Sequence, residues 1–139
     1  MNDAQTSQTD RSPYTAIGGD EAVRKLVDRF YDLMDEDPQV APLRQMHARS
    51  LRVSREKLYK FLSGWLGGPD LYVQQYGHPR LRRRHLPFAI GSRERDQWMA
   101  CMNRALDEQV DNALLRDQLK ASFYKVADFM RNKEDSPDA

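Results

Sequence analysis

The chain has 139 residues, a length that suits one domain with a single hydrophobic core. Lys and Arg total 22 against 21 Asp and Glu, so the net charge of +1 gives no global reason to expect a nucleic-acid or membrane partner. The single cysteine, Cys101, excludes an intramolecular disulfide and a multi-cysteine zinc site, and it suits a protein of the reducing cytoplasm.

The two ends of the chain have the composition of disordered segments. Residues 1–12 and 132–139 are polar and contain no apolar run. No stretch has the apolar length of a secretion signal or of a bilayer-spanning helix, which needs about 18 residues. We therefore expect a disordered extension over 1–12, one domain over 13–131 and a disordered tail over 132–139.

Four segments carry apolar side chains at the three- and four-residue spacing of a helix, and none alternates as a strand does. Asp20 and Ser54 are the candidate N-caps of the first two helices. Gly67-Gly68-Pro69 ends the second. The fold class is therefore all-α. The four predicted helices are residues 20–36, 54–66, 94–110 and 113–131.

The connections between these helices are irregular. Residues 37–53 are expected to form a loop with about one helical turn, and 67–78 a loop. A short helix fits residues 79–86, because Pro79 can open it and Pro87 disfavours helix at the residue before it. A helix of two turns is not stable alone in water, so something must anchor it.

His85 is the histidine best placed to bind an iron. It shares a face of the short helix with Leu81, and Leu86, Phe88 and Ile90 follow it. A neutral imidazole in an apolar slot is what a haem iron needs on its proximal side. A hydrogen-bonded core histidine is the alternative. A zinc site is less favoured because the three histidines lack ligand spacing.

Two further patterns have a structural and a functional interpretation. Four arginines lie within residues 80–84, and they form either a solvated helix face or a partner for an acidic cofactor such as the haem propionates. Contact with nucleic-acid phosphates is least favoured, because it needs a wider basic face. Tyr31 and Trp98 fit core packing, but their O–H and N–H would be a donor pair if they met in one cavity.

With these residues described, the chain closely resembles the truncated haemoglobins of group II over residues 13–131. The element GHPRLRRRHLPF followed by RDQW is its most specific part. The resemblance implies a two-over-two helical sandwich, a shortened globin fold with a mostly extended loop before the proximal helix, and one haem b. The matching segments are YTAIGG (14–19), RFY (29–31), FLSGWLGGP (61–69), GHPRLRRRHLPFAI (77–90) and RDQWMACM (95–102).

The resemblance also implies roles for individual residues. His85 resembles the proximal iron ligand, Tyr31 and Trp98 resemble distal residues that stabilise the gas ligand, and His47 falls at the third distal position. The other expected haem-pocket residues are Ser54, Leu58, Phe61, Leu62, Leu81, Phe88, Ile90 and Met102, and the expected propionate contacts are Lys57, Tyr72 and Arg84.

These roles predict that the chain binds O2, CO and NO at a five-coordinate iron. They also predict slow release of O2, because hydrogen-bond donors stabilise negative charge on the bound ligand. The expected assembly is a monomer or homodimer. Slow release argues against simple oxygen transport. One alternative is a redox enzyme at the same haem, with peroxidase-like or nitric oxide dioxygenase activity and an external reductase. A second is a non-haem helical interaction module whose arginines bind an acidic partner. Whether His47 also ligates the iron stays open.

Overall fold

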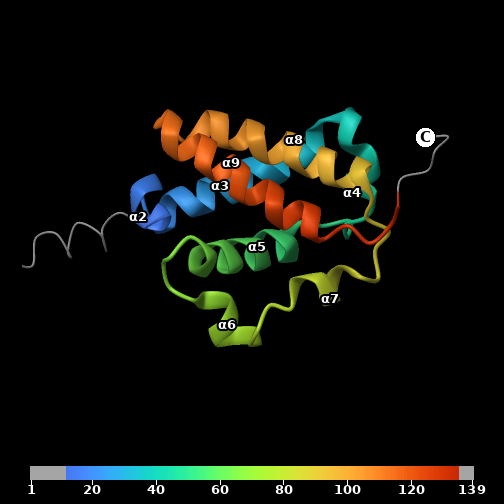
Figure 1. The fold of residues 1–139 in the computed structure, drawn as a ribbon, viewed down its shortest axis with the longest axis horizontal. Coiled ribbons are helices and arrows are strands. Elements are labelled where there is room, and N and C mark those ends of the chain that lie inside the picture. Colours follow the sequence, from blue (N-terminus) through green and yellow to red (C-terminus); the bar gives the residue numbers. More distant parts are fainter. Residues whose placement is uncertain (1–11, 135–139) are drawn as a thin grey trace, which may run out of the picture.

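Four long helices form the frame of the fold in the computed structural model, which describes residues 12–134. Helix α3 packs on both α5 and α8, and α8 packs on α9. Figure 1 shows the α8–α9 pair lying over α3 and α5, and the described residues contain no strand. The all-α, two-over-two sandwich is confirmed. The four helices are α3 (Asp20–Glu36), α5 (Arg52–Trp65), α8 (Ser92–Gln109) and α9 (Ala113–Phe129).

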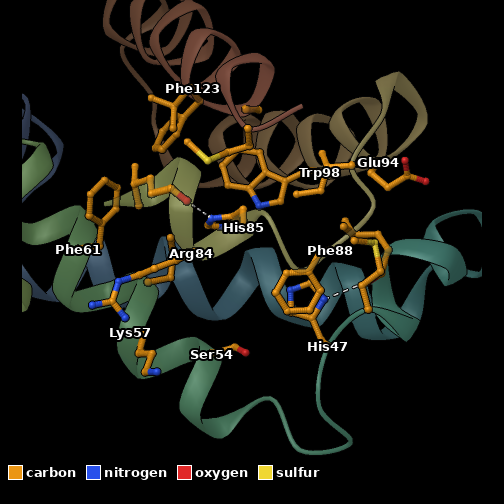
Figure 2. A pocket seen from close by; sticks show the side chains of 18 of the residues that line it. His47, Ser54, Lys57, Phe61, Arg84, His85, Phe88, Glu94, Trp98 and Phe123 are labelled. Atoms are coloured by element: carbon orange, nitrogen blue, oxygen red, sulfur yellow. Dashed lines mark hydrogen bonds between the residues drawn. The ribbon is translucent and has the colours of Figure 1, made fainter. Parts of the chain in front are cut away.

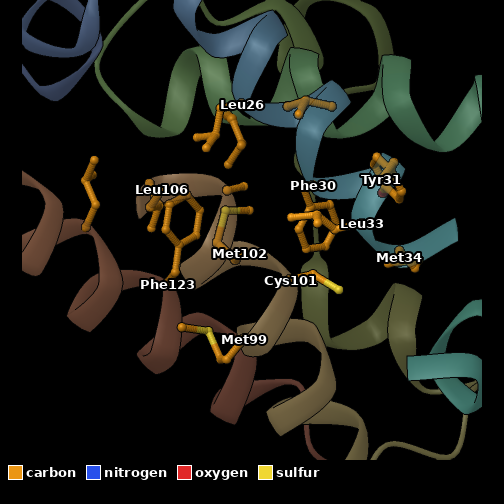
Figure 3. Packing of buried hydrophobic residues seen from close by; sticks show 14 of the residues in the cluster. Leu26, Phe30, Tyr31, Leu33, Met34, Met99, Cys101, Met102, Leu106 and Phe123 are labelled. Carbon is orange, nitrogen blue, oxygen red and sulfur yellow. The ribbon is translucent and has the colours of Figure 1, made fainter. Parts of the chain in front are cut away.

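The hydrophobic core lies between α3, α8 and α9 (Figure 3). On α3, Leu26 and Phe30 are at most 1% exposed, four residues apart on one face. They share the core with Met102, Leu106 and Phe123 from the other two helices. Burying a side chain of this size stabilises the fold by roughly 1.5–3 kcal/mol. The apolar stripes seen in the sequence are therefore the surfaces that join the layers.

Both predicted N-caps are wrong. Gly19 occupies the N-cap of α3 with a φ of 77°, and the carboxylate of Asp20 instead accepts a hydrogen bond from the Tyr59 hydroxyl. Helix α5 begins at Arg52, so Ser54 lies inside it, where its side chain cannot cap the first turn. Glycine takes the left-handed backbone of such a cap without the steric cost of a Cβ.

The connections contain more helix than the sequence predicts. The loop predicted over 67–78 is wrong in part, because residues Leu71–Tyr76 form α6. Helix α7 is confined to Leu81–His85 rather than 79–86, since Arg80 before it has a left-handed φ of 46°. Segments this short show too few apolar positions to reveal a period. The remaining short elements are α2 (Pro13–Ile17), η1 (Pro38–Val40) and α4 (Ala41–Gln45).

Some residues assigned to the disordered ends take part in the fold. The Ser12 hydroxyl accepts a hydrogen bond from the Thr15 amide at 3.2 Å, and the Asn132 amide donates to the Ile90 carbonyl at 2.8 Å. The ordered domain therefore extends beyond 13–131. The disorder predicted for residues 1–11 and 135–139 lies outside the described residues. Of the helices within residues 12–134, none has the length and apolarity needed to cross a membrane.

Candidate functional site

A cavity of about 520 Å³ lies between α5, α7, α8 and α9, and its walls are mostly apolar (Figure 2). An apolar cavity with few polar groups is typical of a cofactor or ligand site. The structure brings together on this cavity every predicted site residue except Met102. They are Tyr31, His47, Ser54, Lys57, Leu58, Phe61, Leu62, Tyr72, Leu81, Arg84, His85, Phe88, Ile90 and Trp98.

His85 is held at the end of α7 by its own helix. Its Nδ1 lies 2.6 Å from the carbonyl oxygen of Leu81 (Figure 2). Because a carbonyl can only accept, Nδ1 carries the proton, and in the neutral ring Nε2 keeps its lone pair. Among residues 12–134, no three His, Cys, Asp or Glu side chains gather into a metal site. His85 therefore offers one imidazole nitrogen at the cavity wall.

His47 makes the same kind of contact on another wall of the cavity. Its Nδ1 is 2.9 Å from the carbonyl oxygen of Leu43. Burial lowers the pKa of His47. The hydrogen bond to the Leu43 carbonyl is the next largest effect and opposes burial, while the charge of Arg44 adds to it. At neutral pH the ring is therefore neutral, and its free Nε2 is an acceptor. A donor role for His47 requires the protonated ring.

Tyr31 and Trp98 come from α3 and α8 and line the same cavity. Phe30 packs against both rings, with centroids 4.9 Å from each. Within residues 12–134, neither the Tyr31 hydroxyl nor the Trp98 indole N–H has a hydrogen-bond partner, and Figure 2 shows the indole nitrogen directed between His85 and Phe88. Burial raises the pKa of Tyr31, so its hydroxyl keeps its proton. Two side chains that line the cavity therefore have donors without a partner among the described residues.

Cationic groups stand at the mouth of the cavity. Lys57 and Arg84 are exposed there, and the Arg84 guanidinium lies 5.9 Å from the ring centre of the buried Tyr72. The Arg84 Nε donates to the Pro79 carbonyl at 2.8 Å, which leaves its other nitrogens for an anion. An apolar interior with cations at its rim fits a flat apolar ring bearing carboxylates. The other arginines of the run, Arg80, Arg82 and Arg83, do not line the cavity.

Met102, predicted from the sequence to line the haem pocket, does not lie there. Its side chain is fully buried in the core beside Phe123 (Figure 3) and does not line the cavity. It lies one turn beyond Trp98 on α8, where the helix faces α3. The cavity also has lining residues that the sequence did not indicate, because helical spacing cannot separate core-facing from cavity-facing positions. They are Leu43, Met46, Trp65, Glu94, Arg95, Phe123, Val126, Ala127 and Met130.

Comparison with known proteins agrees with this geometry. The sequence profile of the bacterial-like globins matches residues 12–132. The group 2 truncated hemoglobin YjbI of Bacillus subtilis is 36% identical over 131 residues, which cover 94% of this chain and 96% of that protein.

Two solved structures are similar over most of their length. A cold-adapted truncated hemoglobin from the Antarctic marine bacterium Pseudoalteromonas haloplanktis TAC125 has a TM-score of 0.87 and 50% identity, covering 88% of this chain and 99% of that one. A group II 2-on-2 hemoglobin from the plant pathogen Agrobacterium tumefaciens has a TM-score of 0.86 and 47% identity, covering 89% and 95%.

Proposed function

The chain belongs to the bacterial-like globins, as a haem globin similar to the group II truncated haemoglobins, and we propose that its cavity holds haem b with His85 as the protein ligand to the iron. The observation that carries this proposal is the 2.6 Å contact of His85 Nδ1 with the Leu81 carbonyl. In the neutral ring, that contact places the proton on Nδ1, so Nε2 keeps its lone pair at the cavity wall. When bound, haem supplies an iron that binds diatomic gases, as globins do, here O2, CO or NO.

The proximal side of the site is set by backbone geometry. The Leu81 carbonyl fixes the tautomer and the ring orientation of His85 and makes Nε2 a better ligand, as hydrogen-bonded partners of metal-binding histidines do. At the cavity mouth, Arg84 and Lys57 would pair with the two propionates, and Tyr72 would contact them. Because Arg84 and Lys57 are exposed, their ion pairs with the propionates would orient the haem but add little to its binding free energy.

The distal side of the site slows the release of oxygen. Tyr31 and Trp98 are held by packing on Phe30 rather than by hydrogen bonds to other described residues, so both donors are available to a ligand in the cavity. Fixed donors in an apolar, water-poor site stabilise negative charge on a ligand without reorganising. We therefore propose that the chain binds O2 and other diatomic gases and releases O2 slowly. His47 would add a donor only with its ring protonated; in the neutral ring the Nε2 lone pair would be free to approach the iron.

The test is the absorbance spectrum of the ferric, ferrous and carbonyl forms of the parent chain, His85→Gly and His78→Gly. His78 is the matched control, because it is exposed and does not line the cavity. We expect the parent and His78→Gly to share one set of spectra. His85→Gly should lose haem or change its ferrous spectrum, and added imidazole should restore it. Unchanged spectra for His85→Gly would reject His85 as the ligand. A parent chain with no Soret band would reject the haem and favour the non-haem module.

A further inference from the structure

The helix that carries His85 has little of its own to hold it. Helix α7 spans Leu81–His85 and buries none of its side chains. On one side it borders the cavity, and Figure 1 shows the chain after α9 passing close to the segment that follows α7. A five-residue helix is not stable alone in water. The contacts of α7 with the chain after α9 therefore determine the position of His85.

The side chain of Asn132 binds three backbone groups of the segment from His85 to Ile90. Its Nδ2 donates to the carbonyl oxygens of Phe88 at 2.8 Å and His85 at 3.2 Å. Its Oδ1 accepts from the Ile90 amide at 2.9 Å. Two carbonyls need the donor end and one N–H needs the acceptor end, so only one orientation of the amide satisfies all three.

Arg82 makes the reciprocal contact from α7 to the end of α9. One of its terminal nitrogens donates to the carbonyl oxygens of Phe129 at 2.9 Å and Arg131 at 2.7 Å. The last carbonyls of a helix have no intrahelical partner and carry partial negative charge, so a guanidinium there satisfies and stabilises them. The two segments are therefore joined in both directions by side chain to backbone hydrogen bonds.

We propose that Asn132 and Arg82 form a proximal clamp, in which the residues after α9 position His85 toward the iron. The role toward the iron rests on the function proposed above. Asn132 acts through the backbone of α7 and touches neither the cavity nor a ligand, so it is a positioning residue. Without it, the His85 carbonyl loses its outside partner, and α7 can tilt and change the direction of the imidazole.

The first experiment compares Asn132→Ala with Lys133→Ala in the haem-loaded chain. Lys133 is the matched control, since it is the exposed neighbour and joins the segment only through its backbone N–H, to the Ile90 carbonyl at 3.1 Å. We expect Asn132→Ala to shift the iron–histidine stretching frequency of the ferrous form in resonance Raman spectra. It should also speed haem transfer to an acceptor apoglobin about tenfold, as the loss of one or two net hydrogen bonds would. Lys133→Ala should change neither.

The second experiment uses the haem-free chain, which separates the clamp from the haem. In amide hydrogen exchange, Asn132→Ala should expose the Ile90 amide, whereas Asn132→Asp should keep it protected, because Asp retains the acceptor oxygen. Asp cannot donate to the His85 and Phe88 carbonyls, so once loaded with haem it should shift the stretching frequency as Ala does. An unshifted frequency in Asn132→Ala overturns the positioning role, even if haem transfer is faster. An unprotected Ile90 amide in the parent overturns the clamp itself, whether or not haem binds.

Discussion

Tyr31 is buried and Trp98 is partly buried, and both line the cavity. Of the described residues, none accepts a hydrogen bond from either. Their default role on an apolar helix stripe is packing, and the Phe30 ring fulfils that role between them. A residue that donates to a ligand therefore differs from one that only packs in where its polar atom lies. The spacing of residues along a helix does not predict that position.

We expect Tyr31→Phe and Trp98→Phe each to speed oxygen release. Each removes one donor while keeping an aromatic ring, and a hydrogen bond to a charged group is worth about 1.5–3 kcal/mol, or roughly 10- to 150-fold in rate. Stopped-flow measurement of oxygen and carbon monoxide release checks this, with carbon monoxide as the internal control, because it carries less negative charge and should respond less. Oxygen release unchanged in both variants would remove the donor argument.

His47 links the pocket to pH. Because burial lowers its pKa, the folded chain takes up a proton at this site less readily than the unfolded chain. Stability from this group is therefore fully present above about pH 6.5, the unperturbed value, and is lost as the pH falls below it. In the carbonyl form, we expect the free energy of unfolding to fall less between pH 7 and pH 5 in His47→Phe than in the parent.

Denaturant titrations at pH 8, 7 and 5 measure that difference. Between pH 8 and 7 the two chains should change nearly in parallel, because the ring is mostly neutral in both the folded and the unfolded chain there. An acid loss as large in His47→Phe as in the parent would show that another group is responsible.

At the scale of elements, the corner between α5 and α6 depends on glycine for a close approach. A Cβ built on Gly68 would lie 2.4–2.6 Å from three ring atoms of Tyr14. That ring cannot easily withdraw, because the Tyr14 amide donates to the Leu66 carbonyl at 2.8 Å and holds α2 against the corner.

We expect Gly68→Ala to lower the free energy of unfolding by roughly 1–3 kcal/mol, the usual cost of forcing extra volume into a packed site. A double-mutant cycle with Tyr14→Ala isolates the cause. If the ring is the obstacle, Gly68→Ala should cost much less in the Tyr14→Ala background. Additive effects of the two substitutions would show instead that the backbone of the corner is strained.

The elements differ in how far the sequence predicts them. The four long helices each repeat their apolar spacing over several turns, so their position was predictable to within a few residues. Helix α6 and the left-handed Arg80 were not, since short segments follow tertiary contacts rather than a period. The pocket residues came from the family resemblance. Met102 shows the limit of that inference, because one helical turn separates a cavity wall from the core.

At the scale of the whole molecule, the core and the cavity are built from the same long helices and share a wall, to which Leu62 and Phe123 belong. The most buried residues of α3 and α8, such as Phe30 and Leu106, belong to the core cluster and do not line the cavity. Helix α7, by contrast, buries no side chain, and its inner face is a wall of the cavity. Stability should therefore be uneven, with the cavity side depending on what fills it.

Haem removal tests this division. We expect amide exchange in the haem-free chain to rise at least tenfold over α6 and α7, Leu71–His85, while the buried turns of α3 and α8 stay protected. The Ile90 amide should remain slow, because its acceptor is Asn132 and not the haem. Titrating haem back should raise the midpoint of unfolding with haem concentration, since the group binds only the folded chain. Uniform exchange across all helices on haem removal would mean instead that the core and the cavity unfold as one unit, and that the packing of α3 on α8 does not stand without the cofactor.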